Sequence, residues 1–532
     1  MRRGGARTGL IALAVLAGCT APAPVPPAPA TPTATASAGG GTLRVAVAEP
    51  QELLPQRAGA LPEQWIADAL FDGLTAWGND LRPVPAAAAS WEHVGLSRWR
   101  FHLRADATWH DGSAVTAADF VRGWNRVVHD EVMAHLLADV QGYAEVQVGR
   151  APALSGVRAV GPLTVEVTLV RPLADFPAVA GHPALAPLPA GASRPGFAAQ
   201  PVGNGPFLAT EARVPGRFVR LRRFAAWRNG PPPPLDEIVF QTMDPETGFL
   251  AFQQGRVHVA EVPPGALAAA RDRYGERIGM PVRPSLYLLG MDLTRPPFSQ
   301  VALRRALTQA IDRAGLARSV REGATAETAG LLVPTLPEWT PEDCADCGYD
   351  PAVAGAAFAA AGVSRLTLTF NEGGGHEQVA DRLRRDLAQA GVALTLEPMP
   401  DTTYFRAVRA GRLSLFRSGW QADVPLADAV LRPLLHSSAI PAAPEVDDTL
   451  GHNTGRYRSA AVDALLDQAA ETESDVVRAA RYRQAARLAV FTDHALVPLF
   501  AYRLRVAVRR EVRGSTADAM GLIDWAALSI AS

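Results

Sequence analysis

Residues 366–396 read LTLTFNEGGGHEQVADRLRRDLAQAGVALTL, and this stretch decides the fold class of the chain. Leu366–Phe370 is expected to be a strand, Glu377–Ala390 a helix and Val392–Leu396 a second strand. A strand, a helix and a strand in this order form a βαβ unit, whose two strands run parallel in one sheet. The sequence therefore predicts a mixed α/β fold with partly parallel sheet.

Strands and helices alternate irregularly along the rest of the chain. The expected strands are Gly41–Ala48, Trp99–Leu103 and Leu163–Leu169, and the expected helices are Gln64–Phe71 and Val301–Ile311. Thr116–Asp119 has the spacing of a capping box, in which a hydroxyl and a carboxylate satisfy the first N–H groups of a helix that continues through Arg126. Residues 176–206 are rich in Pro, Gly and Ala, and we expect a passage between two lobes there.

The composition is that of a globular chain with little net charge. The 532 residues are 48% hydrophobic and 20% charged, with a formal net charge of -1. This length is ample for two or three packed domains, and the near-neutral balance offers no basic field for nucleic acid. Beyond the N-terminus, no stretch approaches the roughly 18 consecutive apolar residues of a spanning helix. All 52 basic residues are arginine, which excludes lysine-based Schiff-base chemistry.

The N-terminus has the pattern of a secretory signal that ends in a lipobox. Three arginines within the first seven residues precede an apolar run, and Leu16–Cys19 places small residues before a cysteine. We expect residues 1–18 to be a signal peptide and Cys19 to carry a lipid anchor. The apolar run is much shorter than the ~20 residues of a spanning helix. A chance cysteine after an uncleaved segment is the alternative.

The segment that follows, residues 19–41, is expected to be a tether. It consists almost wholly of Ala, Pro, Thr, Ser and Gly, and Val25 is its one larger apolar residue, so it cannot build a core. Everything beyond Cys19 is therefore expected outside the cytoplasm, held to the cell membrane by the lipid.

The other two cysteines, Cys344 and Cys347, admit three interpretations: a local disulfide, half of a metal site, or a redox pair. Exported chains meet an oxidising environment, and the sequence has no second cysteine pair to complete four metal ligands. No preceding βαβ pattern frames the pair as a thioredoxin-like motif. A structural disulfide is therefore favoured, and the other two interpretations stay open.

Several short motifs, in order along the chain, resemble the signature of a known family. They are Trp99–Arg104, Thr108–Gly112, Val115–Val121, Gly203–Phe207, Pro297–Arg313 and Gly419–Asp423. Together they make the chain similar to the peptide-binding proteins of ABC importers, solute-binding protein family 5, from about Gly41 to Pro498. Phe120–Arg126, which includes Trp124, resembles the oligopeptide-binding branch of that family.

The resemblance implies a two-lobed α/β fold of the periplasmic-binding-protein kind (type II, cluster C), with mixed sheets and an extra subdomain. Lobe I is expected to comprise residues 42–78, 200–285 and 497–532, the extra subdomain residues 79–199, and lobe II residues 286–496. In this family a peptide binds between the lobes, and hinge closure presents the loaded form to the membrane subunits of an ABC permease. The resemblance also implies a monomer without cofactor, metal or catalytic residues.

The resemblance further implies where a peptide would bind. In the family, the Asp of the Gly-Trp-x-x-Asp segment receives the peptide α-amino group, which implies Asp423 here, with Trp420 and Gly419 beside it. The alternative for Asp423 is an N-cap of a helix over Ala427–Leu435. His376 follows three glycines at a helix start, and it is expected either to help to bind the carboxylate end of the peptide or to be a solvated loop histidine.

Two residues depart from the family pattern and keep other ligands open. Val424 stands where the family has Tyr after the Asp, and Arg122 stands where oligopeptide-binding members often have a tyrosine that faces the site. An extra cation at Arg122 is expected to favour an acidic or otherwise anionic ligand. A binder of a metal chelate or a sugar, or a receptor for a signalling peptide, therefore stays an alternative.

Motifs for catalysis or metal binding are weak in this sequence. Gly-x-Ser-x-Gly does not occur, and His376-Glu377 has Ala380 where His-Glu-x-x-His needs its second histidine, so an exported hydrolase is the least supported alternative. His110–Gly112 invites a metal interpretation, but in the family this segment is a turn. The chain is expected to be a binding protein and not an enzyme.

Overall fold

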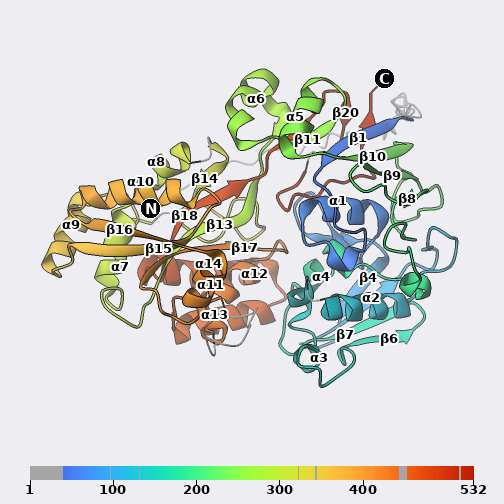
Figure 1. Cartoon of the computed structure of the whole chain (residues 1–532). Coiled ribbons are helices and arrows are strands. Elements are labelled where there is room, and N and C mark those ends of the chain that lie inside the picture. The colour runs from blue at the N-terminus through green and yellow to red at the C-terminus, as the bar shows by residue number, and fades with distance from the viewer. Residues whose placement is uncertain are drawn as a thin grey trace, which may run out of the picture. The chain divides into compact units, whose positions relative to one another are not determined.

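The βαβ unit predicted from residues 366–396 is present in the computed structural model of the chain (Figure 1). Strand β15 (Arg365–Asn371) leads into helix α10 (His376–Gln389), and strand β16 (Ala393–Met399) returns parallel to β15. The predicted mixed α/β class with parallel strand pairing is therefore confirmed.

The structure describes residues 40–95, 97–130, 132–320, 323–341, 344–441, 452–514 and 517–531. These residues belong to one compact unit that runs from Gly39 to Ser532. The predicted signal peptide, Cys19 and nearly all of the tether lie outside the described residues. Within the described residues, no helix combines the length and the apolar character that crossing a membrane requires.

The βαβ unit is part of a six-stranded sheet with the order β14-β18-β13-β17-β15-β16. Its other strands are β13 (Val282–Met291), β14 (Thr325–Glu327), β17 (Leu415–Gln421) and β18 (Leu496–Arg503). Strand β13 pairs antiparallel with both β17 and β18, whereas β17 runs parallel to β15. The sheet thus joins widely separated parts of the chain.

Helices cover both faces of this sheet, and alternate residues of β13 divide between the two faces. One set comprises α7 (Val301–Gln309), α8 (Arg313–Ser319), α9 (Pro351–Ala360) and α10, and the other comprises α12 (Ala427–Leu435), α13 (Ala460–Glu471) and α14 (Asp475–Arg487). Tyr287 and Leu289 pack with the first set, and Leu286 and Leu288 pack with the second. This alternation is the period of two that a strand buried on both faces requires.

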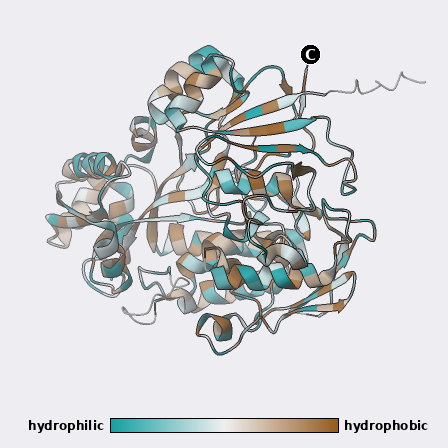
Figure 2. Ribbon diagram, turned by 45° about the vertical axis from the view of Figure 1, so that its right-hand side comes forward, coloured by the Kyte–Doolittle hydropathy of each residue, from teal (hydrophilic) through white to brown (hydrophobic). Residues whose placement is uncertain are grey.

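A second sheet has seven strands in the order β12-β19-β11-β1-β10-β9-β8. Its strands are β1 (Thr42–Val47), β8 (Phe207–Ala209), β9 (Phe218–Arg223), β10 (Glu237–Thr242), β11 (Val259–Glu261), β12 (Ile278–Gly279) and β19 (Val506–Val508). Val45 of β1 packs in one apolar cluster with α1 (Leu61–Leu70), and Ala46 packs in another with α5 (Pro245–Gln253) and α6 (Leu267–Tyr274). Figure 2 shows apolar stretches along these strands, whereas the helix surfaces mix apolar and polar residues.

A third, antiparallel sheet of four strands packs with helix α2 (Ala117–Asp130). Its order is β4 (Ala88–His93), β5 (Arg98–Leu103), β7 (Thr164–Thr168) and β6 (Val157–Gly161). The capping box at the start of α2 differs from the prediction in one contact. The N–H and the hydroxyl of Thr116 both donate to the carboxylate of Asp119, at 2.8 and 2.9 Å, so the hydroxyl serves as a donor.

The described chain also contains shorter elements. They include the paired strands β2 (Thr75–Trp77) and β3 (Pro83–Pro85), the paired strands β20 (Val512–Arg513) and β21 (Ser529–Ile530), the helices α3 (Tyr143–Gln147), α4 (Phe176–Val179) and α11 (Asp401–Arg409), and the 3-10 helix η2 (Ala134–Leu137). Residues 176–206 lead from the four-stranded sheet to β8 of the seven-stranded sheet. Cys344 and Cys347 are joined by a disulfide, with their Cα atoms 5.3 Å apart.

The Gly203–Phe207 segment is a turn that docks on the end of α1. A Cβ atom at Gly203 would lie 1.9 Å from the carbonyl oxygen of Leu70, so only glycine fits there. Nδ1 of His110 accepts the N–H of Gly203 at 3.0 Å, and Nε2 of the same ring lies 3.1 Å from the carbonyl oxygen of Gly205. Because both ring nitrogens hold this turn, the geometry favours the turn interpretation of this histidine over the metal interpretation.

Candidate ligand-binding site

The ends of two parallel strands bring predicted site residues to one edge of the six-stranded sheet. Strand β17 ends at Gln421, two residues before Asp423, and β15 ends at Asn371, shortly before His376. Since β15 and β17 run parallel, both carboxyl ends lie at the same edge of the sheet. Loops that follow such strand ends are a common place for ligand sites in α/β folds.

Two cavities open at this edge and share part of their wall. The larger has a volume of about 970 Å³ and the smaller about 520 Å³. Ser285, Arg417, Gln421 and Tyr502 line both cavities. The larger volume is near the upper end of the range of about 300–1,000 Å³ that is usual for ligand pockets.

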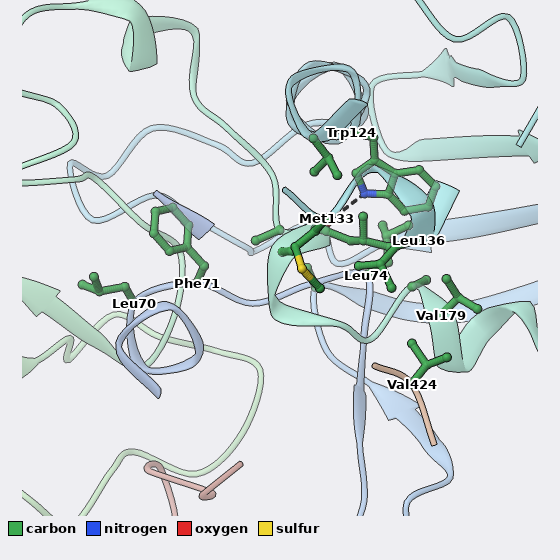
Figure 3. Packing of buried hydrophobic residues seen from close by; sticks show 14 of the residues in the cluster. Leu70, Phe71, Leu74, Trp124, Met133, Leu136, Val179 and Val424 are labelled. Carbon is green, nitrogen blue, oxygen red and sulfur yellow. Dashed lines mark hydrogen bonds between the residues drawn. The ribbon is translucent and has the colours of Figure 1, made fainter. Parts of the chain in front are cut away.

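The larger cavity has an extensive apolar and aromatic wall. This wall includes Leu136, Leu173, Val179, Leu286, Tyr404, Phe405, Val408, Trp420 and Val424. Val424, just after β17, belongs to the same apolar cluster as Leu136 and Val179, which come from the part of the chain around the four-stranded sheet (Figure 3). A ligand in the larger cavity would therefore contact two distant segments of the chain at once.

The smaller cavity lies between the two large sheets. Ala46 and Trp65 line it from β1 and α1, on the side of the seven-stranded sheet. Arg283, His376 and Arg503 line it from β13, α10 and β18, on the side of the six-stranded sheet. Residues from elements near all three sheets thus line one or the other of the two cavities.

Asp423 lines the larger cavity, where His135 of η2 contacts it. Nε2 of His135 lies 2.7 Å from Oδ2 of Asp423, and the two side chains are 38% and 29% exposed. Burial raises the pKa of Asp423, but the hydrogen bond and charge of His135 and the charges of His182 and Arg283 outweigh burial, so the pKa lies below its ordinary value of 3.8. Asp423 is therefore an ionised carboxylate in this site.

The alternative interpretation of Asp423 as a helix N-cap is wrong. Helix α12 begins at Ala427, and its N-cap residue is Leu426, which offers no side-chain hydrogen bond. The carboxylate of Asp423 thus faces the cavity and His135 instead of the free N–H groups of the helix.

Gly419 and Trp420 support the wall beside Asp423. The indole N–H of Trp420 donates to the carbonyl oxygen of Ala429 at 2.7 Å, and its ring centre is 4.7 Å from that of His452. A Cβ atom at Gly419 would lie 2.9 Å from the carbonyl oxygen of Leu286, so the glycine permits the close approach of β17 to β13. Both residues line the larger cavity.

Arg283, Arg417 and Arg503 form a positive end of the site, because none of them has a carboxylate partner among the described residues. The guanidinium of Arg417 lies 5.2 Å from the ring centre of Tyr287. The Nε atoms of Arg283 and Arg417 are buried without a hydrogen-bond partner within the described chain. Burial lowers the pKa of Arg283 and of Arg503. Such cations are suited to a carboxylate or another anion of a ligand.

A separate ion cluster lines the larger cavity and balances its own charges. One nitrogen of Arg171 lies 2.6 Å from Oδ2 of Asp139 and 2.6 Å from Oδ2 of Asp428, and Nε of Arg432 lies 3.1 Å from Oδ1 of Asp428. Burial raises the pKa of Asp428, but the charges of Arg171 and Arg432 outweigh burial and keep the pKa below its ordinary value. This cluster joins α12 to the segment that follows β7.

His376 and Arg122, the other two predicted ligand residues, lie in different places. His376 is the first residue of α10, lines the smaller cavity and packs with its ring centre 5.5 Å from that of Tyr287. It is 6% exposed, so it is not a solvated loop histidine. Arg122 lies on α2, donates to the carboxylate of Asp119 at 2.7 Å and to the carbonyl oxygen of Leu188 at 2.5 Å, and lines neither cavity. Its effect on ligand charge stays a prediction.

The structure adds site residues that sequence reasoning missed. They are His135, Arg283, Arg417 and Tyr502. His135, Arg283 and Tyr502 stand in no motif that points to a ligand. Arg417 stands two residues before Gly419, so the Gly-Trp-x-x-Asp segment was the one signal near it.

The chain matches a known protein family and is similar to several known proteins. Residues 82–442 match the middle part of the bacterial extracellular solute-binding proteins, family 5. The chain is 28% identical over 475 residues to the probable deoxycholate-binding periplasmic protein YgiS of Escherichia coli (strain K12), over 85% of this chain and 86% of that protein. It is 26% identical over 496 residues to the periplasmic oligopeptide-binding protein OppA of the same strain, over 88% of each chain.

Solved structures of other proteins have the same fold as this chain. The unliganded open form of the periplasmic murein tripeptide-binding protein MppA matches with a TM-score of 0.81, at 22% identity, over 92% of this chain and 97% of that one. The two-lobed fold of the periplasmic-binding-protein kind, which the sequence resemblance implied, is therefore confirmed. The residue bounds of the two lobes stay a prediction.

Proposed function

The chain belongs to the bacterial extracellular solute-binding proteins of family 5, and we propose that it binds peptides between its two lobes for delivery to the membrane subunits of an ABC importer. The observation that carries the proposal is an ionised carboxylate and arginines without a carboxylate partner in the described chain, which line two adjoining cavities. The ionised Asp423 lies in the larger cavity, Arg417 lies on the shared wall, and Arg283 lies in the smaller cavity. A zwitterionic peptide has a charged group for each end of such a site.

Physical chemistry supports a peptide in this arrangement. Closure of the lobes on a ligand removes water from its charged ends, so each end needs a partner in the protein. The arginines would bind the terminal carboxylate, and Asp423 would bind the α-ammonium group through a charge-assisted hydrogen bond. The apolar and aromatic wall of the larger cavity would hold side chains loosely, which permits many peptide sequences.

We propose a location outside the cytoplasm, with a lipid anchor on Cys19 and residues 19–41 as a tether. The lipobox at Leu16–Cys19 and the periplasmic relatives support this location. Mass spectrometry of the N-terminal fragment tests it, because a diacylglyceryl group on Cys19 has a characteristic mass. A protein that fractionates with membranes equally well after Cys19→Ala would contradict the anchor.

Native mass spectrometry tests the peptide proposal most directly. The full chain is purified in detergent, and the small molecules released on denaturation are sequenced.

Asp423→Ala is expected to weaken peptide binding by about 2–4 kcal/mol, because the ammonium group loses its counter-charge. Asp272→Ala, which removes an exposed carboxylate of α6, is the matched control. Normal peptide binding by the Asp423 variant would refute the role of that residue, and a wild type that ignores di- to decapeptides would refute peptide binding.

A second candidate ligand is an apolar molecule with a carboxylate. Three observations favour it: Asp423 already has His135 as a partner, Arg283 and Arg417 have no carboxylate partner within the described chain, and the larger cavity has a broad apolar wall. A relative with 28% identity is named as a probable deoxycholate binder. Thermal unfolding with deoxycholate and with peptides distinguishes the candidates, because only the true ligand class raises the melting temperature at low concentration.

A further inference from the structure

The carboxylate proposed to receive a peptide amino group already has a partner from the protein itself. His135 and Asp423 both line the larger cavity, and Nε2 of the imidazole lies 2.7 Å from Oδ2 of the carboxylate. About a third of each side chain is exposed, so a ligand in the cavity can reach both groups. The contact joins two parts of the chain that are 288 residues apart.

Packing holds His135 in this position. Its neighbours in η2 are buried: Ala134 is 3% exposed and Leu137 is 0% exposed. Both belong to the apolar cluster that also contains Val424, the residue after Asp423. The backbone that carries the imidazole is therefore fixed relative to the carboxylate, and the contact does not depend on a mobile loop.

We propose that His135 is a specificity-determining residue, a built-in counter-ion that a ligand ammonium group must displace from Asp423. The inference rests on the proposed peptide site and defines which peptides it selects. An α-ammonium group that enters beside the imidazole in its protonated form would put two cations on one carboxylate, and the charge of the nearby Arg283 opposes a further positive charge. A peptide whose first group is neutral, such as an N-acylated peptide, avoids this repulsion.

The geometry also offers such a neutral group a favourable contact. The imidazole can donate to Asp423 while the apolar wall beside it, from Leu136 and Val179, accepts the methyl or longer chain of an acyl group. We therefore infer that His135 raises the binding of peptides with a blocked amino end relative to the same peptides with a free amino end, which Asp423 still accepts. This tolerance of blocked ends comes from His135 and not from the Gly419–Asp423 segment.

A competition experiment tests this inference on the full chain in detergent. The probe is an equimolar mixture of lysine-free tri- to pentapeptides and the same peptides after complete N-acetylation, and mass spectrometry measures the ratio of acetylated to free peptide that the protein retains. Wild type is expected to retain acetylated peptide as well as free peptide. His135→Ala should lower the ratio at least tenfold, because it frees the Asp423 carboxylate for an ammonium group.

Two further variants separate charge from packing. His135→Gln keeps a hydrogen-bond donor without a cation, and it should also lower the ratio. His129→Ala removes an exposed histidine of α2 that lines neither cavity, and it should leave the ratio unchanged. If His135 were only a packing residue, its variants would retain less of the acetylated and of the free peptides, at an unchanged ratio. That result would overturn the inference. If wild type and all variants retained neither acetylated nor free peptides, the proposed peptide function would instead be refuted.

Discussion

Glu338 is a buried carboxylate whose ionisation we expect to destabilise the folded chain. It is 6% exposed, and its Oε2 atom has no hydrogen-bond partner among the described residues. Burial, with a smaller contribution from the charge of Asp175, raises its pKa from 4.5 to about 7. The informative perturbation is Glu338→Gln, which preserves the shape of the side chain and removes its charge.

The sign and size of the effect follow from the pKa difference. Because the pKa of Glu338 is higher in the folded chain than in the unfolded chain, the folded chain binds more protons between pH 4.5 and about 7. The free energy of unfolding therefore falls as the pH rises through this window, by about 3 kcal/mol at 1.36 kcal/mol per pKa unit. The Gln variant lacks this loss. It is expected to match wild type near the lower pH and to be more stable by about 3 kcal/mol above the window.

Thermal unfolding at a series of pH values measures this difference. The matched control is Glu473→Gln, which changes a carboxylate that lines, together with Glu338, a third cavity of about 460 Å³, but is 78% exposed. The control should track wild type at every pH. If the melting temperatures of wild type and Glu338→Gln differed by the same amount at both ends of the window, the reasoning from burial would be wrong.

Three further changes test other parts of the structure. Gly419→Ala should destabilise the chain by about 1–3 kcal/mol in thermal unfolding, because its Cβ atom would lie 2.9 Å from the carbonyl oxygen of Leu286. Arg171→Ala should destabilise it by about 3–5 kcal/mol, because the buried Asp428 loses a partner at 2.6 Å, and an unchanged melting temperature would contradict this role. Arg417→Ala should weaken a peptide with a free carboxyl end at least tenfold, or about 1.4 kcal/mol, and leave the C-terminal amide of that peptide unaffected in calorimetry.

The elements that could be predicted from the sequence are those whose evidence is local. Strand β15, helix α10 and strand β16 follow from apolar periodicity within one short stretch, and the structure has all three in parallel pairing. Helix α1 was expected from Gln64 but begins at Leu61. Pro62 explains the difference, because the first turn of a helix tolerates the missing N–H of proline. Periodicity alone does not locate a helix start that a proline marks.

The candidate site could be predicted only in part, because its charged partners are far apart in the sequence. The Gly-Trp-x-x-Asp segment identified Asp423, but no local pattern indicates that His135 lies opposite it, 288 residues away. Arg171 and Asp428, 257 residues apart, were missed for the same reason. Periodicity and capping describe neighbours in the chain, whereas these pairs form only after the sheets have packed.

This separation has a consequence for how ligand preference can change within the fold. The position of His135 depends on the burial of Ala134 and Leu137 in η2, which lie outside the Gly419–Asp423 segment. A substitution at position 135 can therefore change which ligand group binds at Asp423 while the Gly419–Asp423 segment stays intact. Two chains with the same segment can thus prefer free or blocked amino ends, and only the residue that packing places against the carboxylate distinguishes them.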